Sequence, residues 1–256
     1  MMRKVLLLSA AAWLAALSCS NVNGPPSADG GQPAYFPNGD GSRWTYRYQR
    51  YFNNVPSGEP YYYDEYFEGT AVVDGVEAQR LVRAPRAATA WELSYVADDD
   101  ENTVLLYGRE FYTGALQTEA VYFEPPWSAL VYPLTVNRSW SEVKQEGLTP
   151  AALGLPADLD GDGADDAVDV EIVCKTVTKE DLTLPIEMFP DCYKVRRTVY
   201  ATFHMTTGGD VEETYVRYGW FKPGRGYVQY TGDEITVPNA ARYTYLVQLE
   251  AYELAR

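Results

Sequence analysis

The amino-acid sequence predicts an all-β, mainly antiparallel fold: a curved sheet, half-barrel or sandwich with few short helices. Apolar and polar residues alternate through many short segments, which is typical of strands with one buried face. Turn-forming pairs such as Asp74-Gly75 separate these segments. Aromatic residues make up 14% of the 256 residues, a supply of core side chains that disordered acidic chains lack. We therefore expect residues 35–256 to form a single β-rich domain.

Residues 1–18 are predicted to be the signal peptide of a lipoprotein. Arg3 and Lys4 form its basic start, and the apolar segment 5–17 is too short for a transmembrane helix. The leader ends in ALSC, which resembles the bacterial lipobox and makes Cys19 the lipidated residue. The resemblance implies that the mature protein carries palmitate. Because Ser20 is not aspartate, it also implies transfer of the protein to the outer membrane. The alternative is ordinary cleavage near Ser18 and a soluble secreted product.

Residues 19–34 are expected to tether the domain to this anchor. They are rich in Gly, Pro, Ser and Asn, the composition of a flexible linker. The formal net charge is −15, and an acidic surface of this kind repels phosphate backbones. We therefore expect contact with a membrane through the lipid anchor and no nucleic-acid partner.

The strands are predicted from the start of the domain onward. Trp44, Tyr46 and Tyr48 alternate with polar residues and predict a strand with an aromatic inner face. A hairpin with strands at 61–73 and 76–82 follows. Later strands are predicted at 91–97, 103–107, 117–123, 168–177, 192–203, 215–221 and 227–231. The segment 241–254 alternates like a strand but contains helix formers, so a helix is the alternative.

Residues 158–169, DLDGDGADDAVD, carry the most definite chemistry of the sequence. Six carboxylates within twelve residues repel one another unless a cation lies among them. The spacing fits the calcium loop D-x-[DN]-x-[DN]-G, with Gly163 at the sharp turn. The expected ligands are the side chains of Asp158, Asp160, Asp162, Asp166 and Asp169 and the backbone carbonyl of Ala164. Asp169 stands at the last position of the loop, where a longer, bidentate glutamate is usual.

The flanks of this loop differ from the two helices of an EF-hand. One helical turn is predicted at 149–154, with Thr149 as its N-cap and Pro150 at its first position, and a strand follows the loop. The stretch resembles the DxDGDGxxD calcium loops of secreted bacterial proteins. We expect a structural Ca²⁺; the alternative is an acidic surface turn without metal.

Two cysteines remain beside Cys19. An even pair in an exported protein is most simply a disulfide, so we predict a bond between Cys174 and Cys192 on neighbouring strands.

Four segments resemble a family of uncharacterised bacterial lipoproteins. They are YFPNGDGSRWTYRY (35–48), VYPLTVNRSW (131–140), LPIEMFPDCYKVRRT (184–198) and WFKPGRGYVQY (220–230). The family shows patterns similar to YFPL.VG..W.Y, VPAGTF.DC.KV and Y.PGVGLVK. This chain lacks the glycine of the second pattern and has Arg225 where the third has valine. The resemblance implies an exported antiparallel β domain and no known catalytic residue.

No catalytic constellation stands out in the sequence. The single histidine, His204, lies in a predicted strand, and the motifs GxSxG, HExxH and the P-loop are absent. We expect a non-catalytic envelope lipoprotein whose domain binds or scaffolds an envelope component. The alternative is a periplasmic carrier of a lipid or other hydrophobic ligand in a concave sheet, and a glycoside hydrolase is less favoured. A cavity of roughly several hundred Å³ would favour the carrier, and a filled core the scaffold.

Overall fold

The computed structural model describes residues 39–99 and 102–255, so the signal peptide, Cys19 and the tether lie outside the described residues. The described chain consists of β-strands and one 3₁₀ turn, η1. Their bounds are β1 Arg43–Phe52, β2 Val55–Pro56, β3 Tyr61–Val73, β4 Val76–Pro85, β5 Ala90–Asp98, β6 Thr103–Thr113, β7 Leu116–Val131, β8 Ser139–Leu148, η1 Pro150–Leu153, β9 Ala167–Thr183, β10 Met188–Met205, β11 Gly209–Lys222, β12 Gly226–Asp233 and β13 Thr244–Glu253. The predicted all-β, antiparallel fold is confirmed.

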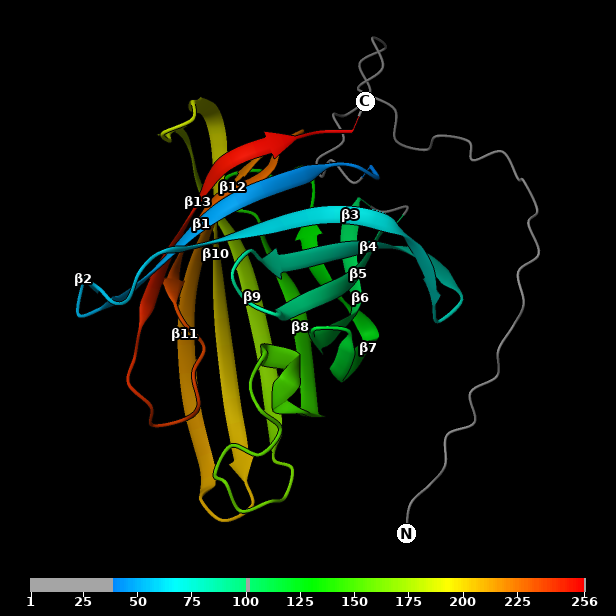
Figure 1. Cartoon of the computed structure of the whole chain (residues 1–256), viewed down its shortest axis with the longest axis vertical. Helices are drawn as coiled ribbons and strands as arrows, with labels where there is room; N and C mark the ends of the chain where they lie inside the picture. The colour runs from blue at the N-terminus through cyan, green and yellow to red at the C-terminus, as the bar shows by residue number, and fades with distance from the viewer. Residues whose placement is uncertain (1–38, 100–101, 256) are drawn as a thin grey trace.

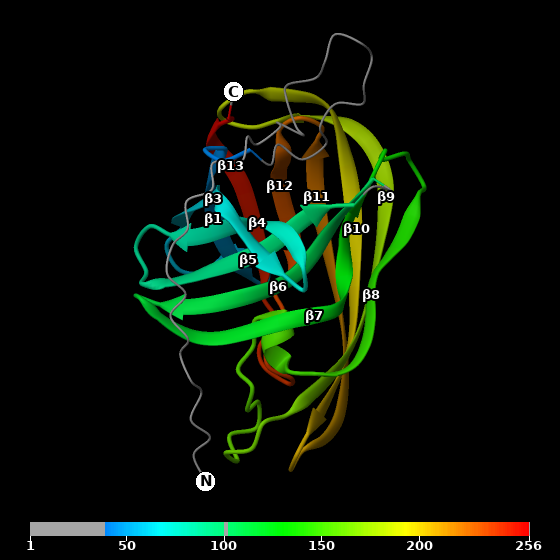
Figure 2. The ribbon, with the colours of Figure 1, turned by 90° about the vertical axis from the view of Figure 1, so that its right-hand side faces the viewer.

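The strands form one antiparallel sheet in the order β7-β6-β5-β4-β3-β1-β13-β12-β11-β10-β9-β8, with β2 paired to β1. The sheet curves until its two ends approach each other. The long strands β9–β11 run lengthwise while β3–β7 run across them (Figures 1 and 2). Of the alternatives predicted from the sequence, a strongly curved, nearly closed sheet is the one observed.

The two edge strands, β7 and β8, meet at a seam held by side chains. Backbone pairing between them is absent from the described residues. Three bonds span the gap instead: Trp127 Nε1 donates to Gln145 Oε1 (2.8 Å), Gln145 Nε2 to Glu124 O (2.6 Å) and Trp140 Nε1 to Ser128 O (3.1 Å).

Alternation of apolar residues sets the inner face of the sheet. In β9 the buried positions Val168, Val170, Ile172 and Cys174 alternate with partly exposed ones, because successive strand residues point to opposite faces. Trp44 and Tyr46 on β1 are 2% and 1% exposed and join the same core, as predicted. Burying a large aromatic side chain stabilises the fold by about 1.5–3 kcal/mol.

The local predictions around the helical turn and the last strand are also confirmed. Thr149 caps η1, its hydroxyl accepting from Ala151 N, and Gly154 ends the turn in the left-handed conformation. The segment for which strand and helix were both considered contains β13. In the part of the chain that the structure describes, no helix is long and apolar enough to span a membrane.

The predicted disulfide is wrong. Cys174 and Cys192 do lie on neighbouring strands, β9 and β10, but both are buried free thiols. Cys174 is opposite Arg197, and Cys192 is opposite Glu180, six residues further along β9. At about 3.3 Å per residue this offset is roughly 20 Å, far beyond the ~7 Å between Cα atoms that a disulfide tolerates.

Candidate functional site

The concave side of the sheet encloses a cavity of about 450 Å³, which we call the barrel cavity. Strands from both halves of the sheet build its wall. Its lining includes the aromatic residues Tyr48, Tyr61, Tyr63, Trp127, Tyr227, Tyr230 and Tyr245, the aliphatic residues Leu81, Val96, Val104, Leu106, Val195 and Val247, and the charged residues Glu65, Arg83, Glu92, Arg109, Glu142, Arg197, Arg217 and Glu234. A lining of this kind combines an apolar surface with a few fixed charges, as in ligand-binding pockets.

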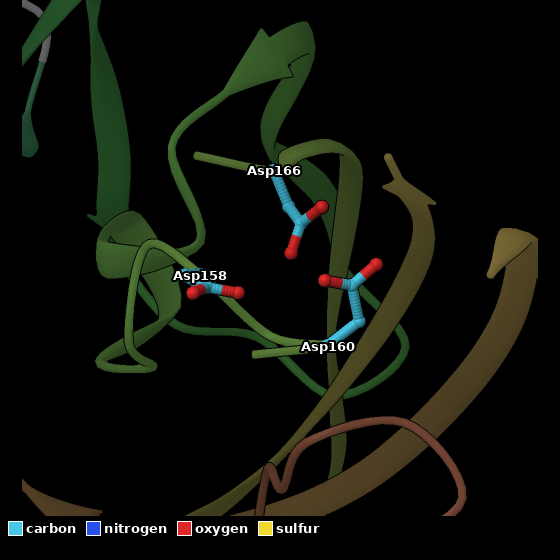
Figure 3. A group of neighbouring side chains, drawn as sticks. All are labelled: Asp158, Asp160 and Asp166. Carbon is cyan, nitrogen blue, oxygen red and sulfur yellow. The ribbon is translucent and has the colours of Figure 1, made fainter. Parts of the chain in front are cut away.

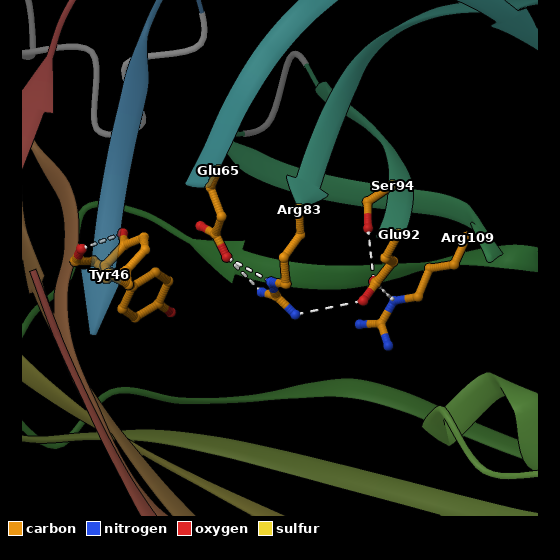
Figure 4. Close-up of polar contacts among 7 residues, drawn as sticks. Tyr46, Glu65, Arg83, Glu92, Ser94 and Arg109 are labelled. Atoms are coloured by element: carbon orange, nitrogen blue, oxygen red, sulfur yellow. Dashed lines mark hydrogen bonds and ion pairs between the residues drawn. The ribbon is translucent and has the colours of Figure 1, made fainter. Parts of the chain in front are cut away.

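Four of the charged side chains form a row across β3–β6 (Figure 4). Arg83 is the direct cross-strand partner of both Glu65 and Glu92. Its guanidinium lies 2.7 Å from Glu65 Oε1 and 3.5 Å from Glu92 Oε2. The row ends at Arg109 on β6, whose Nε lies 3.4 Å from Glu92 Oε1. Opposite charges therefore alternate from strand to strand along the wall.

The neighbouring arginines keep Glu92 ionised. Burial raises the pKa of this carboxyl, but the charges of Arg83 and Arg109 and a hydrogen bond from Ser94 outweigh it, so the pKa lies below its ordinary value. For Arg83, burial lowers the pKa, and the charges of Glu65 and Glu92 raise it well above the ordinary value. Arg83 and Glu92 are thus fixed charges at neutral pH.

A second ion pair faces the cavity from the long strands. Arg197 on β10 donates to Glu142 on β8 through Nε (2.6 Å) and Nη2 (2.7 Å), a bidentate contact. The Glu142 side chain is only 5% exposed. Cys174 Sγ, between them on β9, lies 3.4 Å from Glu142 Oε2. Burial, followed by the Glu142 charge, raises the pKa of this thiol well above its ordinary value, so the thiol stays protonated.

Arg217 on β11 lies directly opposite Arg197 in the strand register. Its Nε donates to the carbonyl of Asp233 at 3.0 Å, and its guanidinium lies 5.6 Å from the ring centre of Tyr245. Among the described residues, no carboxylate lies within ion-pair distance of Arg217. This side chain therefore brings an uncompensated positive charge to the cavity.

Tyrosine rings pack in pairs at and beside the cavity wall. Tyr46 stacks on Tyr63 with ring centres 5.2 Å apart, and Tyr227 packs against Tyr230 at 4.8 Å. Burial is the main cause that raises the pKa of Tyr46, Tyr63 and Tyr230 well above the ordinary value. These hydroxyls stay neutral, and that of Tyr46 donates to Tyr227 O at 2.7 Å.

None of the charged residues of the cavity could be singled out as a site residue by a sequence motif. A usable signal was present: Val195, Arg197 and Val199 occupy alternate positions of β10, and both valines are buried. A charge at such an inward position indicates either a buried ion pair or a polar cavity.

The acidic loop, residues 158–169, brings three of the predicted ligands together (Figure 3). One carboxylate oxygen from each of Asp158, Asp160 and Asp166 lies within 4.8 Å of the other two. The Asp158 carboxylate also accepts from Gly161 N (2.7 Å) and Gly163 N (2.9 Å), which folds the loop around it.

Hydrogen bonds connect the loop to the turn between β10 and β11. Thr207 donates to Asp160 Oδ2 through its backbone N (3.0 Å) and its hydroxyl (2.7 Å). Thr206 N donates to Asp166 Oδ1 (2.8 Å), and the Thr206 hydroxyl donates to Asp162 Oδ2 (2.6 Å). Bonds from Thr207 are the main cause that lowers the pKa of Asp160, so this carboxylate is charged at neutral pH.

Two predicted side-chain ligands lie apart from the cluster of three. Asp162 contacts Thr206, as above, and accepts from Ala164 N at 2.8 Å. Asp169 accepts from Gly147 N at 2.8 Å and lies 3.0 Å from His204 Nε2. The single histidine thus contacts this loop and is not among the residues that line the barrel cavity.

Comparisons with known proteins give distant structural likenesses only. No family model matches the chain, and no curated protein matches it. A candidate exported protein with a YmcC-like fold from Bacteroides fragilis has a TM-score of 0.35 and 13% identity, over 86% of this chain and 99% of that one. A candidate lipoprotein from Parabacteroides distasonis has a TM-score of 0.36 and 16% identity, over 87% and 99%. A DUF1329 family protein from Desulfovibrio piger has a TM-score of 0.29 and 9% identity, over 83% and 85%. At these scores the likenesses carry no functional argument.

Proposed function

We propose that this protein is a non-catalytic, exported binding protein that holds a ligand with an apolar body in the barrel cavity. The observation that carries the proposal is the cavity of about 450 Å³ that the curved sheet encloses. A purely structural domain has a filled core at this place. Ligand sites in proteins typically span roughly 300–1,000 Å³ and are lined mostly by apolar and aromatic side chains. Of the roles considered from the sequence, the cavity favours the carrier over the scaffold.

The proposal includes export and a lipid anchor. The basic and apolar leader, residues 1–18, supports export, and the ALSC sequence supports lipidation of Cys19 and an outer-membrane location. The tether at 19–34 then leaves the cavity free to meet ligand away from the membrane surface.

The carboxylates of the cavity favour binding over glycoside hydrolysis. A hydrolase needs a carboxylic acid with a raised pKa beside a second carboxylate. Glu65, Glu92 and Glu142 each lie within ion-pair distance of an arginine, and the pKa of Glu92 is lowered. Side chains fixed in this way suit the positioning of a ligand.

The test is whether a small molecule co-purifies with the protein from the cell envelope. Protein purified from its native membrane is extracted with organic solvent, and the extract is analysed by mass spectrometry. We expect one class of small molecule at near-equimolar amount. Leu106→Trp, which fills the cavity, should abolish it, and Val72→Trp at an exposed position should not. The binding role is wrong if the wild type and Leu106→Trp yield the same extract.

We propose, second, that the acidic loop holds one structural Ca²⁺. The approach of Asp158, Asp160 and Asp166 supports this, since oxygen ligands suit Ca²⁺ and three close carboxylates repel without a cation. Asp166 and Asp160 also accept hydrogen bonds from Thr206 and Thr207. An ion that holds these carboxylates in place would therefore also stabilise the contact between the loop and the β10–β11 turn. Calorimetric titration with calcium tests this proposal.

A further inference from the structure

The charges that line the barrel cavity do not balance. Glu234 is paired with Arg50 outside the cavity lining, at 2.6 Å. Among the remaining charged residues of the lining, three carboxylates, Glu65, Glu92 and Glu142, face four guanidinium groups. The wall therefore carries one positive charge more than it neutralises.

Two arginines of the lining, Arg109 and Arg217, have groups that can bind a ligand anion. Arg109 Nε has no hydrogen-bond partner among the described residues, although it is buried and 3.4 Å from Glu92. The side chain as a whole is 25% exposed, and because Arg109 lines the cavity, this exposed part faces the interior. An unpaired buried donor of this kind destabilises the site, and a hydrogen-bond acceptor on a ligand removes that cost.

Arg217, unlike Arg109, has no carboxylate within ion-pair distance among the described residues. Its one hydrogen bond within the described residues goes to the carbonyl of Asp233, so its Nη groups are free for a ligand. Arg197, directly opposite, is already occupied by Glu142 in a bidentate contact. Like charges directly opposite on neighbouring strands repel each other, and an anion placed between them offsets that repulsion by its attraction to both.

The pKa values agree with this geometry. Burial first, then the charges of Arg197, Arg109 and Arg83, lowers the pKa of Arg217. Burial likewise is the main cause of the lowered pKa of Arg109, with Arg197 and Arg83 adding to it and Glu92 opposing it. A guanidinium remains protonated in such a site, so its environment favours an added negative charge.

We propose, on the basis of the binding function above, that the ligand is amphipathic and carries one acidic head group. The structure assigns the head group to Arg217 and Arg109 and the apolar body to the aliphatic wall near Leu81, Val104 and Leu106. The planar guanidinium fork suits the two oxygens of a carboxylate or the oxygens of a phosphate ester.

The probes are decanoate, 1-decanol and acetate, which separate the apolar body from the acid. Residues 20–256 are exported behind a leader without a lipobox, purified without detergent, stripped of co-purified lipid and titrated calorimetrically. We expect decanoate to bind about tenfold or more tightly than decanol, a difference of about 1.4 kcal/mol. Acetate should show no measurable binding.

Variants locate the head group. Arg217→Gln should weaken decanoate binding about tenfold and leave decanol binding unchanged, and Arg217→Lys, which keeps the charge but loses the fork, should lie between. Arg196→Gln is the matched control, because Arg196 is the exposed neighbour of Arg197 on the other face of β10. Thermal unfolding of each variant confirms that its fold is intact.

The outcomes separate this inference from the binding function. If decanoate and decanol bind equally and Arg217→Gln changes neither, the acidic head group is wrong and the apolar binding role stands. If acetate binds as tightly as decanoate, the amphipathic ligand is wrong. If neither decanoate nor decanol binds to stripped protein, both the inference and the proposed function fail.

Discussion

Trp127 and Gln145 join the two strands that leave the sheet unclosed: Trp127 Nε1 donates to Gln145 Oε1 at 2.8 Å across the seam between β7 and β8. The same glutamine donates to the carbonyl of Glu124 at 2.6 Å, so one side chain supplies two of the three bonds found there.

Gln145→Ala should therefore destabilise the domain more than an ordinary surface change. It removes both bonds and leaves the indole N–H of Trp127 without its acceptor, which costs about 1–3 kcal/mol. Urea unfolding followed by tryptophan fluorescence measures the loss. Glu146→Ala, an exposed neighbour on β8, is the control and should change stability by less than about 0.5 kcal/mol. Equal effects of the two variants would show that the seam is not held by these bonds.

Asp64 should make stability depend on acidity. Its carboxylate accepts from Thr45 Oγ1 (2.7 Å) and from Arg86 Nη2 (2.8 Å) and Nε (3.2 Å). Burial raises the pKa of Asp64, but the bonds from Arg86 and Thr45 outweigh it, and the pKa is lowered. A lowered folded-state pKa stabilises the fold above the unfolded value, near 3.9, and this contribution is lost as the pH falls through the folded value.

Asp64→Asn should accordingly cost about 1–3 kcal/mol at pH 7 and progressively less toward pH 3. Chemical unfolding of both proteins at pH 7, 5 and 3.5 gives the difference at each pH. Glu68→Gln, at an exposed position of the same strand, should show no such trend. A difference that stays constant with pH would rule out the charged bonds as its cause.

Both buried cysteines should be free in the exported protein. Burial is the main cause that raises the pKa of Cys192 to about 11 and that of Cys174 well above the ordinary value, so few reactive thiolates exist. Native protein should react slowly with iodoacetamide, and unreduced, unfolded protein should take up two labels per chain. Mass spectrometry counts the labels. No label on unreduced, unfolded protein would mean that both thiols are oxidised.

Calcium should stabilise the acidic loop. At a concentration ten times the dissociation constant, binding adds about 1.4 kcal/mol, and the melting temperature rises. Asp158→Asn with Asp160→Asn should abolish the calcium response, and Mg²⁺ should act more weakly because it requires a tighter, octahedral site. Asp165→Asn is the control: it removes one negative charge from an exposed position in the loop, outside the cluster of three. No heat and no thermal shift in the wild type would leave an acidic turn without metal.

The strands could be predicted from the sequence because period-two alternation is local information. The hairpin at Asp74-Gly75 and the cap at Thr149 were predictable for the same reason. The register of distant partners was not. The β9–β10 register places Arg197 opposite Cys174 and Glu180 opposite Cys192, so adjacency of the strands did not bring the two cysteines together.

The cavity could not be predicted from the sequence, for a related reason. Glu142 and Arg197 are 55 residues apart in sequence, and each in isolation reads as a surface charge. Whether facing walls touch or leave a space depends on how far the sheet curves, which no single segment encodes. The acidic loop, in contrast, carries its chemistry within twelve residues, so the sequence indicated it directly.

The position of β1 has a consequence for how the chain folds. This strand pairs on one side with β3, its near neighbour in sequence, and on the other with β13, where Arg43 is opposite Glu253. Contacts between such distant residues give a high contact order, which slows folding because a long loop must close before the contacts form. Until β13 arrives, one edge of β1 exposes unpaired backbone groups to other chains. The domain should therefore fold slowly. Until β13 has paired with β1, it should depend on protection from aggregation.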